Sequence, residues 1–594
     1  MNLKLLRRLS ALSAAAIFLL PSCAFFEKEP DDGSRILTWG TRSGYVDFLD
    51  LAEDTYPDIE LEYSTYAGAD PASYSWAQMR ADDIPDIFIT SRILDADLAR
   101  EKLADLSGYD FADDISGSVL DPAVNDGGTY LLPVCNTLYG IYYNKTLMEE
   151  NGWEIPTDID ELETLCIQIQ NKGMTPGLIC TKTTDDPFSA VFNIAKTGWL
   201  STPEGAKWEQ DFLSGSATAS GMWESTMEDI QRYLNMGMFS ADPQDRSNTE
   251  LLQEELGQRK AVFCTSMLTT VSTDLPNGDE LGMMPYISKD GSKNAYIYNP
   301  YGYIGISSRL TRPGNEKKLE NAVKLLSLLY SPEGQAAFTT ERTPYILSPL
   351  DDADIPEDTL LYDAWQAQRQ GRVFPMTYTG WENVLFDMGQ VYKEWFRGEE
   401  GIDGPAAITL MDELQASYLN HSDNIDLNVC EVTDNFSLEE TAVLSGKVLG
   451  SAVGADAAMI PIASVYKKGE GLRAGISGKL YKGTLDVDGI LAISPSYDGE
   501  YAILTMTGAQ ANDLVETGFH SGGKGEPYPY ILVTKGGGKL EDDKTYQVAF
   551  LMESYTRETG ELYHAQVEEG SFRTFMREWM KEQGSVSPDG NPWE

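Results

Sequence analysis

Histidines and glycine-rich loops are the first places to look for catalysis in this sequence, and neither forms a catalytic pattern. The histidines His421, His520 and His564 lack the spacing of a compact metal-ligand set. Residues 518–525 (GFHSGGKG) come close to a phosphate-binding loop, but glycine occupies the final serine or threonine position and a predicted helix precedes the loop. The chain also contains no Gly-x-Ser-x-Gly elbow. We therefore expect no metal site, no cofactor and no enzymatic activity.

Carboxylate pairs leave one catalytic alternative open, a glycosidase. Asp185–Asp186 and Asp351–Asp352 are such pairs, but a chain with 93 acidic residues produces them by chance. A binding site for sugars needs flat apolar faces and planar polar groups at strand ends, and the chain has 11 tryptophans and 31 tyrosines. The chain therefore has many of the side chains that such a site needs, and nothing positive in the sequence supports a glycosidase.

The elements that would position such side chains alternate between strand and helix. Residues 35–40 (RILTWG), 59–66 and 84–89 read as strands, and residues 47–56 and 96–103 read as helices. This order predicts a parallel α/β sheet. Ligands of such sheets lie beyond the carboxyl ends of strands, which makes residues 39–43 and 90–92 candidate ligand loops.

Length and charge narrow the classes of partner. A chain of 594 residues exceeds one ordinary core and predicts several folding units. Its formal charge of -48 repels phosphate backbones and anionic headgroups, which disfavours nucleic acid and electrostatic adsorption to membranes. We expect a globular monomer with several lobes.

The N-terminus has the pattern of an export signal. Lys4, Arg7 and Arg8 precede an apolar run over residues 9–20, which is too short for a comfortable membrane span. The following Leu-Pro-Ser-Cys resembles a bacterial lipobox, so we expect a signal peptide over residues 1–22, a lipid on Cys23 and a tether over residues 23–34. The resulting location is outside the cytoplasm, anchored to the cell membrane. An ordinary secretory signal and an uncleaved anchor are the alternatives.

The other cysteines do not form a disulfide scaffold. They are odd in number and widely spaced, which predicts buried free thiols. A disulfide bond between Cys166 and Cys180 is the alternative. The set consists of Cys135, Cys166, Cys180, Cys264 and Cys430.

The order of several segments over residues 35–420 resembles the extracellular carbohydrate-binding proteins of ABC importers, family 1. The matching segments are PDIFI with a downstream ADLS, DGGTYLLP (126–133), GIYYNK (140–145), NGWEIPTDIDELETLC (151–166), GQRKAVFCTS (257–266) and YGYIGISS with the helix after it (301–338). The resemblance implies a two-lobed periplasmic-binding-protein-like fold of type II topology over residues 35–425. Lobe 1 would comprise about 35–140 and 290–345, and lobe 2 about 141–289 and 346–425. Predicted helices at 159–172, 224–236, 355–368 and 384–397 would belong to lobe 2.

The resemblance also implies a set of ligand contacts by position. Aromatic rings would stack on the sugar, and Asp47 and Glu382 would accept hydrogen bonds from its hydroxyls. For each aromatic residue the alternative is packing in the core or between the lobes. The implied contacts are Trp39, Arg42, Tyr45, Asp47, Thr90, Tyr139, Trp199, Tyr301, Trp381 and Glu382.

A polar stretch over residues 421–436 separates a further domain, residues 430–594. Its order of segments, with the turn Met506-Thr507-Gly508-Ala509-Gln510, resembles the C-terminal domain of 5'-nucleotidases, a smaller α+β domain. The chain departs from that family at residues 463–471, in a loop that contacts substrate in the family. It also lacks, before residue 430, the metal-binding motifs of the family's catalytic domain.

Together these features predict a substrate-binding lipoprotein of an ABC importer. It would capture a carbohydrate by lobe closure and deliver it to two permease subunits and, through them, to an ATPase. One alternative is a surface protein that binds or processes nucleotides through its C-terminal domain. Another is a ligand-sensing or adhesive lipoprotein without a transporter.

Overall fold

The structure is a computed structural model. It describes residues 32–594 apart from residues 41–44, 94, 121–123, 126, 243, 266–273, 340–345, 352–354, 358, 377–380, 425–427, 464, 467, 469–474, 496–497, 518–529, 552–556 and 594. The signal peptide, Cys23, Arg42 and the loop 518–525 therefore lie outside the described residues. No helix in the described part of the chain is both long and apolar enough to cross a membrane.

Lobe 1 is built on a seven-stranded sheet in the order β11-β4-β10-β3-β1-β2, with β12 paired to β10. β1 pairs in parallel with β2 and β3, whereas β10 runs antiparallel to β3 and β4. The predicted α/β class is confirmed. The strands are β1 Arg35–Gly40, β2 Glu60–Thr65, β3 Ile87–Thr90, β4 Leu132–Tyr139, β10 Tyr296–Ile306, β11 Ile346–Leu347 and β12 Val373–Pro375, and the helices include α2 Val46–Thr55, α3 Pro71–Arg80, α4 Ala96–Lys102, α5 Asp110–Asp113, α12 Glu316–Leu329, α13 Pro332–Thr339 and α14 Tyr362–Arg369.

Lobe 2 has a five-stranded sheet in the order β7-β6-β8-β5-β9. In α7 the apolar residues recur with helical spacing, and the Asp158 side chain caps the helix by accepting from two backbone amides. The strands are β5 Ile141–Asn144, β6 Thr175–Ile179, β7 Ser240–Ala241, β8 Ala261–Thr265 and β9 Leu281–Met284, and the helices include α6 Lys145–Asn151, α7 Ile159–Asn171, α8 Asp185–Ala195, α9 Pro203–Leu213, α10 Glu224–Asn235, α11 Asn248–Leu251, α15 Glu382–Phe396 and α16 Gly404–Asn424.

The chain crosses between the lobes at Gly140 and again near β10, as the resemblance implies, but its last crossing comes later than expected. β11 and β12 both pair within the lobe 1 sheet, and α14 packs its Trp365 into the core cluster of that sheet. The segment 346–375 therefore belongs with lobe 1, and only α15 and α16 return to lobe 2. The sequence places this crossing too early because a two- or three-residue strand carries almost no periodic signal.

Residues 428–594 form a separate domain with its own two core clusters. A five-stranded sheet in the order β17-β14-β18-β16-β19 is joined by a three-stranded sheet, β15-β13-β20. A capping box at Ser437 starts α17. The elements are β13 Asn428–Val432, α17 Leu438–Val453, β14 Ala457–Pro461, β15 Gly483–Asp486, α18 Val487–Ile493, β16 Gly499–Thr507, α19 Gly508–Thr517, β17 Tyr530–Thr534, β18 Thr545–Leu551, α20 Arg557–Leu562, β19 Gln566–Gly570, α21 Phe572–Gln583 and β20 Ser585–Val586.

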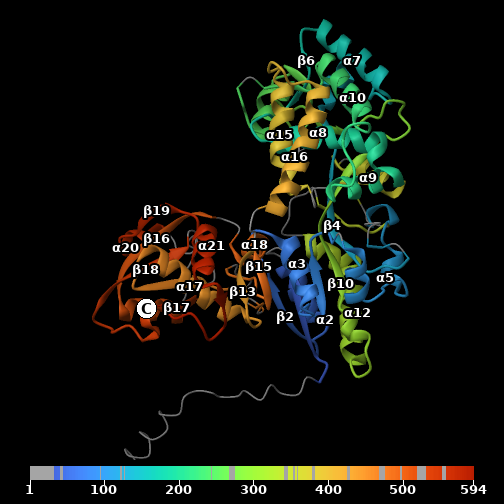
Figure 1. Ribbon diagram of the computed structural model, residues 1–594. Helices are drawn as coiled ribbons and strands as arrows, with labels where there is room; N and C mark the ends of the chain where they lie inside the picture. The colour runs from blue at the N-terminus through green and yellow to red at the C-terminus, as the bar shows by residue number, and fades with distance from the viewer. Residues whose placement is uncertain are drawn as a thin grey trace, which may run out of the picture.

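Figure 1 shows how the three parts are arranged. Lobe 2, with α7, α8, α15 and α16, stands above lobe 1, and the C-terminal domain lies beside lobe 1 with α18 and β15 next to α3. The last helix of lobe 2, α16, ends on the side of the C-terminal domain. The C-terminal domain therefore flanks the region between the lobes.

Candidate functional site

The crossing between the lobes is defined by the close packing of Gly140. A Cβ atom at this position would lie 2.4 Å from the carbonyl oxygen of Met284, so only glycine lets the two strands approach here. On one side Tyr139 pairs with Ile297 in the lobe 1 sheet, and on the other Ile141 pairs with Met284 in the lobe 2 sheet. Gly140, at the lobe boundary that the resemblance implies, thus acts as the hinge and joins two sheets without a loop between them.

Strand β10 exposes side chains only in its middle section. Asn299, Pro300 and Tyr301 are half-buried, whereas the residues on both sides of them are buried. The pairing with β4 shifts register between Pro300 and Gly302 and again between Gly302 and Tyr303. Tyr301 falls in this bulge and is half-buried, four residues along β10 from Ile297, which pairs with Tyr139 beside the crossing.

In lobe 1 the predicted residues at the ends of β1 and β3 have different surroundings. Thr90 is fully buried, and its hydroxyl donates to the Ser75 hydroxyl over 2.5 Å. Asp47 is exposed in the first turn of α2. Trp39 lies in β1 opposite Ser64 and Phe88. Arg42 falls in the loop outside the described residues.

Tyr45 is part of the lobe 1 core. Its backbone has a φ of 73°, which places it as the left-handed residue before α2, and its side chain is 2% exposed. The ring stacks on Phe338 with centroids 3.9 Å apart and meets Tyr63 edge-on. The Tyr45 ring therefore faces the protein interior, because it packs against Phe338 of α13 and Tyr63 of β2.

Lobe 2 brings two of the predicted tryptophans into one aromatic cluster. Trp199 is half-buried in the short π-helix of residues 196–200, and its indole nitrogen donates to the Thr226 hydroxyl over 3.0 Å. Trp381 is fully buried at the start of α15. Both rings contact Trp208, with centroid distances of 5.1 Å for Trp199 and 6.3 Å for Trp381. Glu382 is the first residue of α15.

The predicted ligand residues are thus divided between the two lobes. Tyr139 is buried beside the crossing, and Tyr301 is half-buried in the bulge of β10. Trp199 and Trp381 lie together in lobe 2, and Tyr45, Asp47 and Thr90 lie in lobe 1. Of the residues whose burial is described, Asp47, Trp199 and Tyr301 keep accessible surface for a ligand.

The sequence does not predict a polar network that lies at the carboxyl ends of β6 and β7. Arg397, just after α15, donates to the Thr181 carbonyl over 3.2 Å and pairs with Asp245. Beside it Arg246 makes a paired contact with the buried Asp242, at 2.8 and 3.1 Å. Hydrogen bonds from Arg246 hold the pKa of Asp242 below its usual value. The network fixes three loops that end in the same region.

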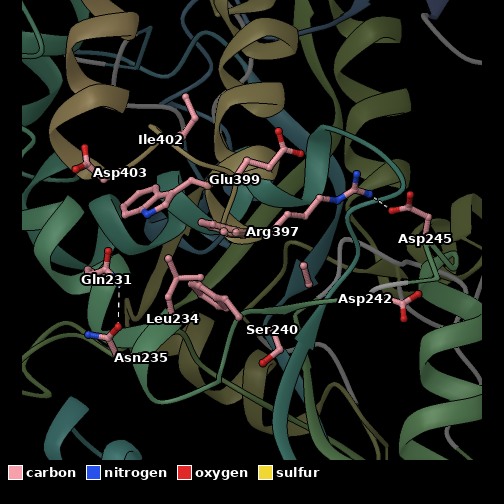
Figure 2. A pocket seen from close by; sticks show the side chains of 15 residues that line it. Gln231, Leu234, Asn235, Ser240, Asp242, Asp245, Arg397, Glu399, Ile402 and Asp403 are labelled. Atoms are coloured by element: carbon pink, nitrogen blue, oxygen red, sulfur yellow. Dashed lines mark hydrogen bonds and ion pairs between the residues drawn. The ribbon is translucent and has the colours of Figure 1, made fainter.

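This network borders a pocket of about 800 Å³, shown in Figure 2. Apolar side chains, including Trp395 and Phe396 from α15, line it together with the polar groups. The volume falls in the range of small-molecule sites, which combine an apolar lining with a few fixed polar groups. No sequence motif identifies it, because its residues come from α10, β7 and the end of α15.

A second polar cluster follows β6 at the start of α8. Asp186 is buried and accepts hydrogen bonds from Asn248 over 2.9 Å and from Thr183 over 3.2 Å. The sequence gives no reason to separate Asp186 from its neighbour Asp185, since acidic pairs are frequent in this chain. Burial distinguishes them, because Asp185 is exposed at the helix start. The described residues contain no cluster of three or more side chains arranged to hold a metal ion.

Residues 50–367, more than half of the chain, match the family model of bacterial extracellular solute-binding proteins. The chain belongs to this family. The solute-binding protein is 25% identical over 266 residues to a binding protein of Brucella abortus, which covers 41% of this chain and 57% of that relative. It therefore spans little more than half the length of this curated relative.

Two other likenesses differ in extent. The diacetylchitobiose-binding protein NgcE of Streptomyces coelicolor is 40% identical over 60 residues, 9% of this chain and 13% of NgcE. A solved binding protein of Bacillus subtilis in an open conformation superposes with a TM-score of 0.53 at 16% identity, over 66% of this chain and 98% of that one. The latter likeness concerns the two-lobed fold. The family model ends before the C-terminal domain of this solute-binding protein.

Proposed function

We propose that this solute-binding protein captures an extracellular carbohydrate between its lobes and presents it to the permease of an ABC importer. The observation that carries the proposal is the family match over both lobes, joined at a tightly packed hinge glycine. Closure would shield the ligand from water and make the closed shape the signal for transport. In this role the protein makes and breaks no bond.

The carbohydrate class is supported by two further points. NgcE, which shares a short similar segment, is named for binding diacetylchitobiose. The accessible predicted residues, Tyr301, Trp199 and Asp47, supply aromatic faces and a carboxylate acceptor, which suit a ring with hydroxyl groups. Trp39, Arg42 and Glu382 remain proposed contacts from the start of lobe 1 and of α15.

We also propose the lipid anchor on Cys23 and a relationship of residues 430–594 to the C-terminal domain of 5'-nucleotidases. The turn that carries the second resemblance marks the end of β16 and the start of α19. There the Thr507 amide donates to the Gln510 side chain over 2.8 Å, and the Gln510 amide donates to the Thr507 hydroxyl over 3.3 Å. Such a reciprocal cap favours a sharp strand-to-helix turn.

A thermal-shift screen of the secreted chain, residues 24–594, tests the proposal. Mono- and oligosaccharides are compared with nucleosides and nucleotides, because a ligand of the native state raises the melting temperature. We expect a saccharide to raise the melting temperature. We expect Tyr301→Ala to weaken the binding of that saccharide about tenfold, or by about 1.4 kcal/mol. Tyr563→Ala, in the C-terminal domain, is the control. A response to nucleotides alone would refute the carbohydrate assignment.

A further inference from the structure

The C-terminal domain covers the free edge of the lobe 1 sheet. β2 is the last strand in that sheet, so one side of its backbone is unpaired within lobe 1. Val465 forms an antiparallel bridge with Ser64, and the Tyr466 amide donates to the Tyr63 carbonyl over 2.7 Å. An exposed strand edge invites association with other chains, and here the chain's own C-terminal domain occupies it.

The same contact surface continues at the carboxyl end of β2. The Ala67 amide donates to the Ser477 hydroxyl over 2.8 Å, and the Ala69 amide donates to the Ser494 carbonyl over 3.0 Å. The hydroxyl of Tyr66, a residue that is 1% exposed, donates to the Ala492 carbonyl over 2.8 Å. Separation of the domain would replace these hydrogen bonds with bonds to water, so each one gives the docked state a modest net stabilisation.

Side chains of α3 add a second layer to the contact. Tyr74 stacks between Tyr66 and Tyr481, with ring centroids 4.6 and 6.4 Å away. Asp83, after the helix, accepts from the Lys479 ammonium over 2.8 Å and from the Tyr481 hydroxyl over 2.9 Å. The surface thus combines aromatic packing with hydrogen bonds to a carboxylate, which are stronger than those between neutral groups.

The contact lies next to the region where lobe 1 would meet ligand. The Tyr66 amide donates to the Gly40 carbonyl over 2.6 Å, so the docked segment directly adjoins the carboxyl end of β1. Ligands of α/β sheets lie beyond these strand ends. Figure 1 shows α18 and β15 flanking lobe 1 below lobe 2.

The covalent connection of the domain comes from the opposite lobe. α16 ends in lobe 2 at Asn424, and β13 begins the C-terminal domain at Asn428. Four Cα steps separate these two residues, which allows a span of at most about 14 Å. The chain therefore links lobe 2 to a domain that is docked on lobe 1.

We infer that the C-terminal domain stays docked on lobe 1 beside the ligand site, and that its short connection to α16 limits how far lobe 2 can open. The inference about the ligand site rests on the proposed function. The docking and the limit on opening do not, because both are properties of the chain without ligand. On closure, lobe 2 moves and the C-terminal domain stays with lobe 1.

Spin-label distances in the secreted chain without ligand test this. Labels on cysteines at the exposed Asp113 of lobe 1, Lys539 of the C-terminal domain and Gln168 of lobe 2 report the two separations. The five native cysteines of the described chain are buried and free. We expect the distribution of the 113–539 distance to be single and narrow. We expect an insertion of eight residues after residue 426 to lengthen the 113–168 distance and to leave the 113–539 distance unchanged. A broad 113–539 distance, or an unchanged 113–168 distance after insertion, would overturn the inference.

Variants of the interface add a second test. Asp83→Ala with Tyr466→Phe removes the partner of Lys479 and the hydroxyl that donates to Asp50. The pair should at least double the width of the 113–539 distribution, whereas Asp82→Asn should leave it narrow, because it removes the charge paired with Lys102 and keeps a side chain that tolerates the φ of 57° at this position. A narrow distribution in the double variant would overturn the docking. Failure of the saccharide screen, with these distances as expected, would refute the proposed function alone.

Discussion

The indole nitrogen of Trp381 donates a hydrogen bond to Oε1 of Glu209 over 2.8 Å, inside the aromatic core of lobe 2. The ring is fully buried and stacks on Phe212 with centroids 5.2 Å apart. Trp381 directly precedes α15, and Glu209 and Phe212 belong to α9. In this conformation Trp381 holds the two helices together.

Replacement of Trp381 by a small residue should therefore lower the stability of lobe 2. We expect Trp381→Ala to lower the free energy of unfolding by about 3–5 kcal/mol, as for other large buried aromatic residues. Chemical denaturation measures it, and Trp199→Phe, at a half-buried ring of the same cluster, should cost much less. If Trp381→Ala instead kept its stability and lost saccharide binding, the ligand contact implied by the sequence would be the correct role.

A side chain at the hinge glycine should disturb the crossing. Gly140→Ala would place a methyl group 2.4 Å from the Met284 carbonyl oxygen, which forces the β5–β9 pairing apart. We expect a loss of stability of about 1–3 kcal/mol from overpacking and a changed affinity for saccharide. Gly108→Ala, where a Cβ atom meets open space, is the control. Equal stability of both variants would contradict the close packing at Gly140.

Asp279 should make lobe 2 sensitive to acid. Its carboxylate accepts hydrogen bonds from Arg259, Asn144 and Asn277, at 2.6 to 2.8 Å. The Arg259 contact, followed by the two amides, holds the pKa of Asp279 well below its usual value. A carboxyl group whose folded pKa is depressed stabilises the fold above its unfolded pKa of about 3.9, and this contribution is lost as the pH falls toward the folded pKa.

Asp279→Asn should lower stability at pH 7 by about 2 kcal/mol, since Arg259 is partly exposed and the pair is screened. The variant should also lose less stability than the natural chain between about pH 5 and pH 2. Denaturation at a series of pH values measures both effects. Asp97→Asn, with a side chain that is 94% exposed, serves as the control. Parallel pH curves for Asp279→Asn and the natural chain would contradict the assignment.

The buried cysteines should react slowly in the folded protein. Burial raises the pKa of Cys166 to about 12 and that of Cys430 to about 11, so few thiolates form at neutral pH. Cys166 and Cys180 are separate free thiols in the structure. A thiol reagent should label the folded secreted chain slowly, and five thiols should react after unfolding without reductant. A count of three would indicate the Cys166–Cys180 bridge.

The sequence by itself determines the class of fold and most of its elements. Strong periodic segments, such as residues 159–171 and 224–235, form helices where the apolar spacing predicts them. The lobe boundary at about residue 140 also comes from the sequence, through the order of segments that resembles the solute-binding family. These features depend on local patterns, which the chain carries in its own order of residues.

Only the tertiary structure decides which aromatic residues face a ligand and which face the core. Tyr45 and Trp381 follow glycine-containing stretches at the start of helices, as ligand residues do, yet both rings are buried by distant segments, Phe338 and Phe212. The network of Arg397 with Thr181 and Asp245 likewise joins residues far apart in the chain. Burial and long-range pairing depend on how separate elements pack, and no local pattern records that packing.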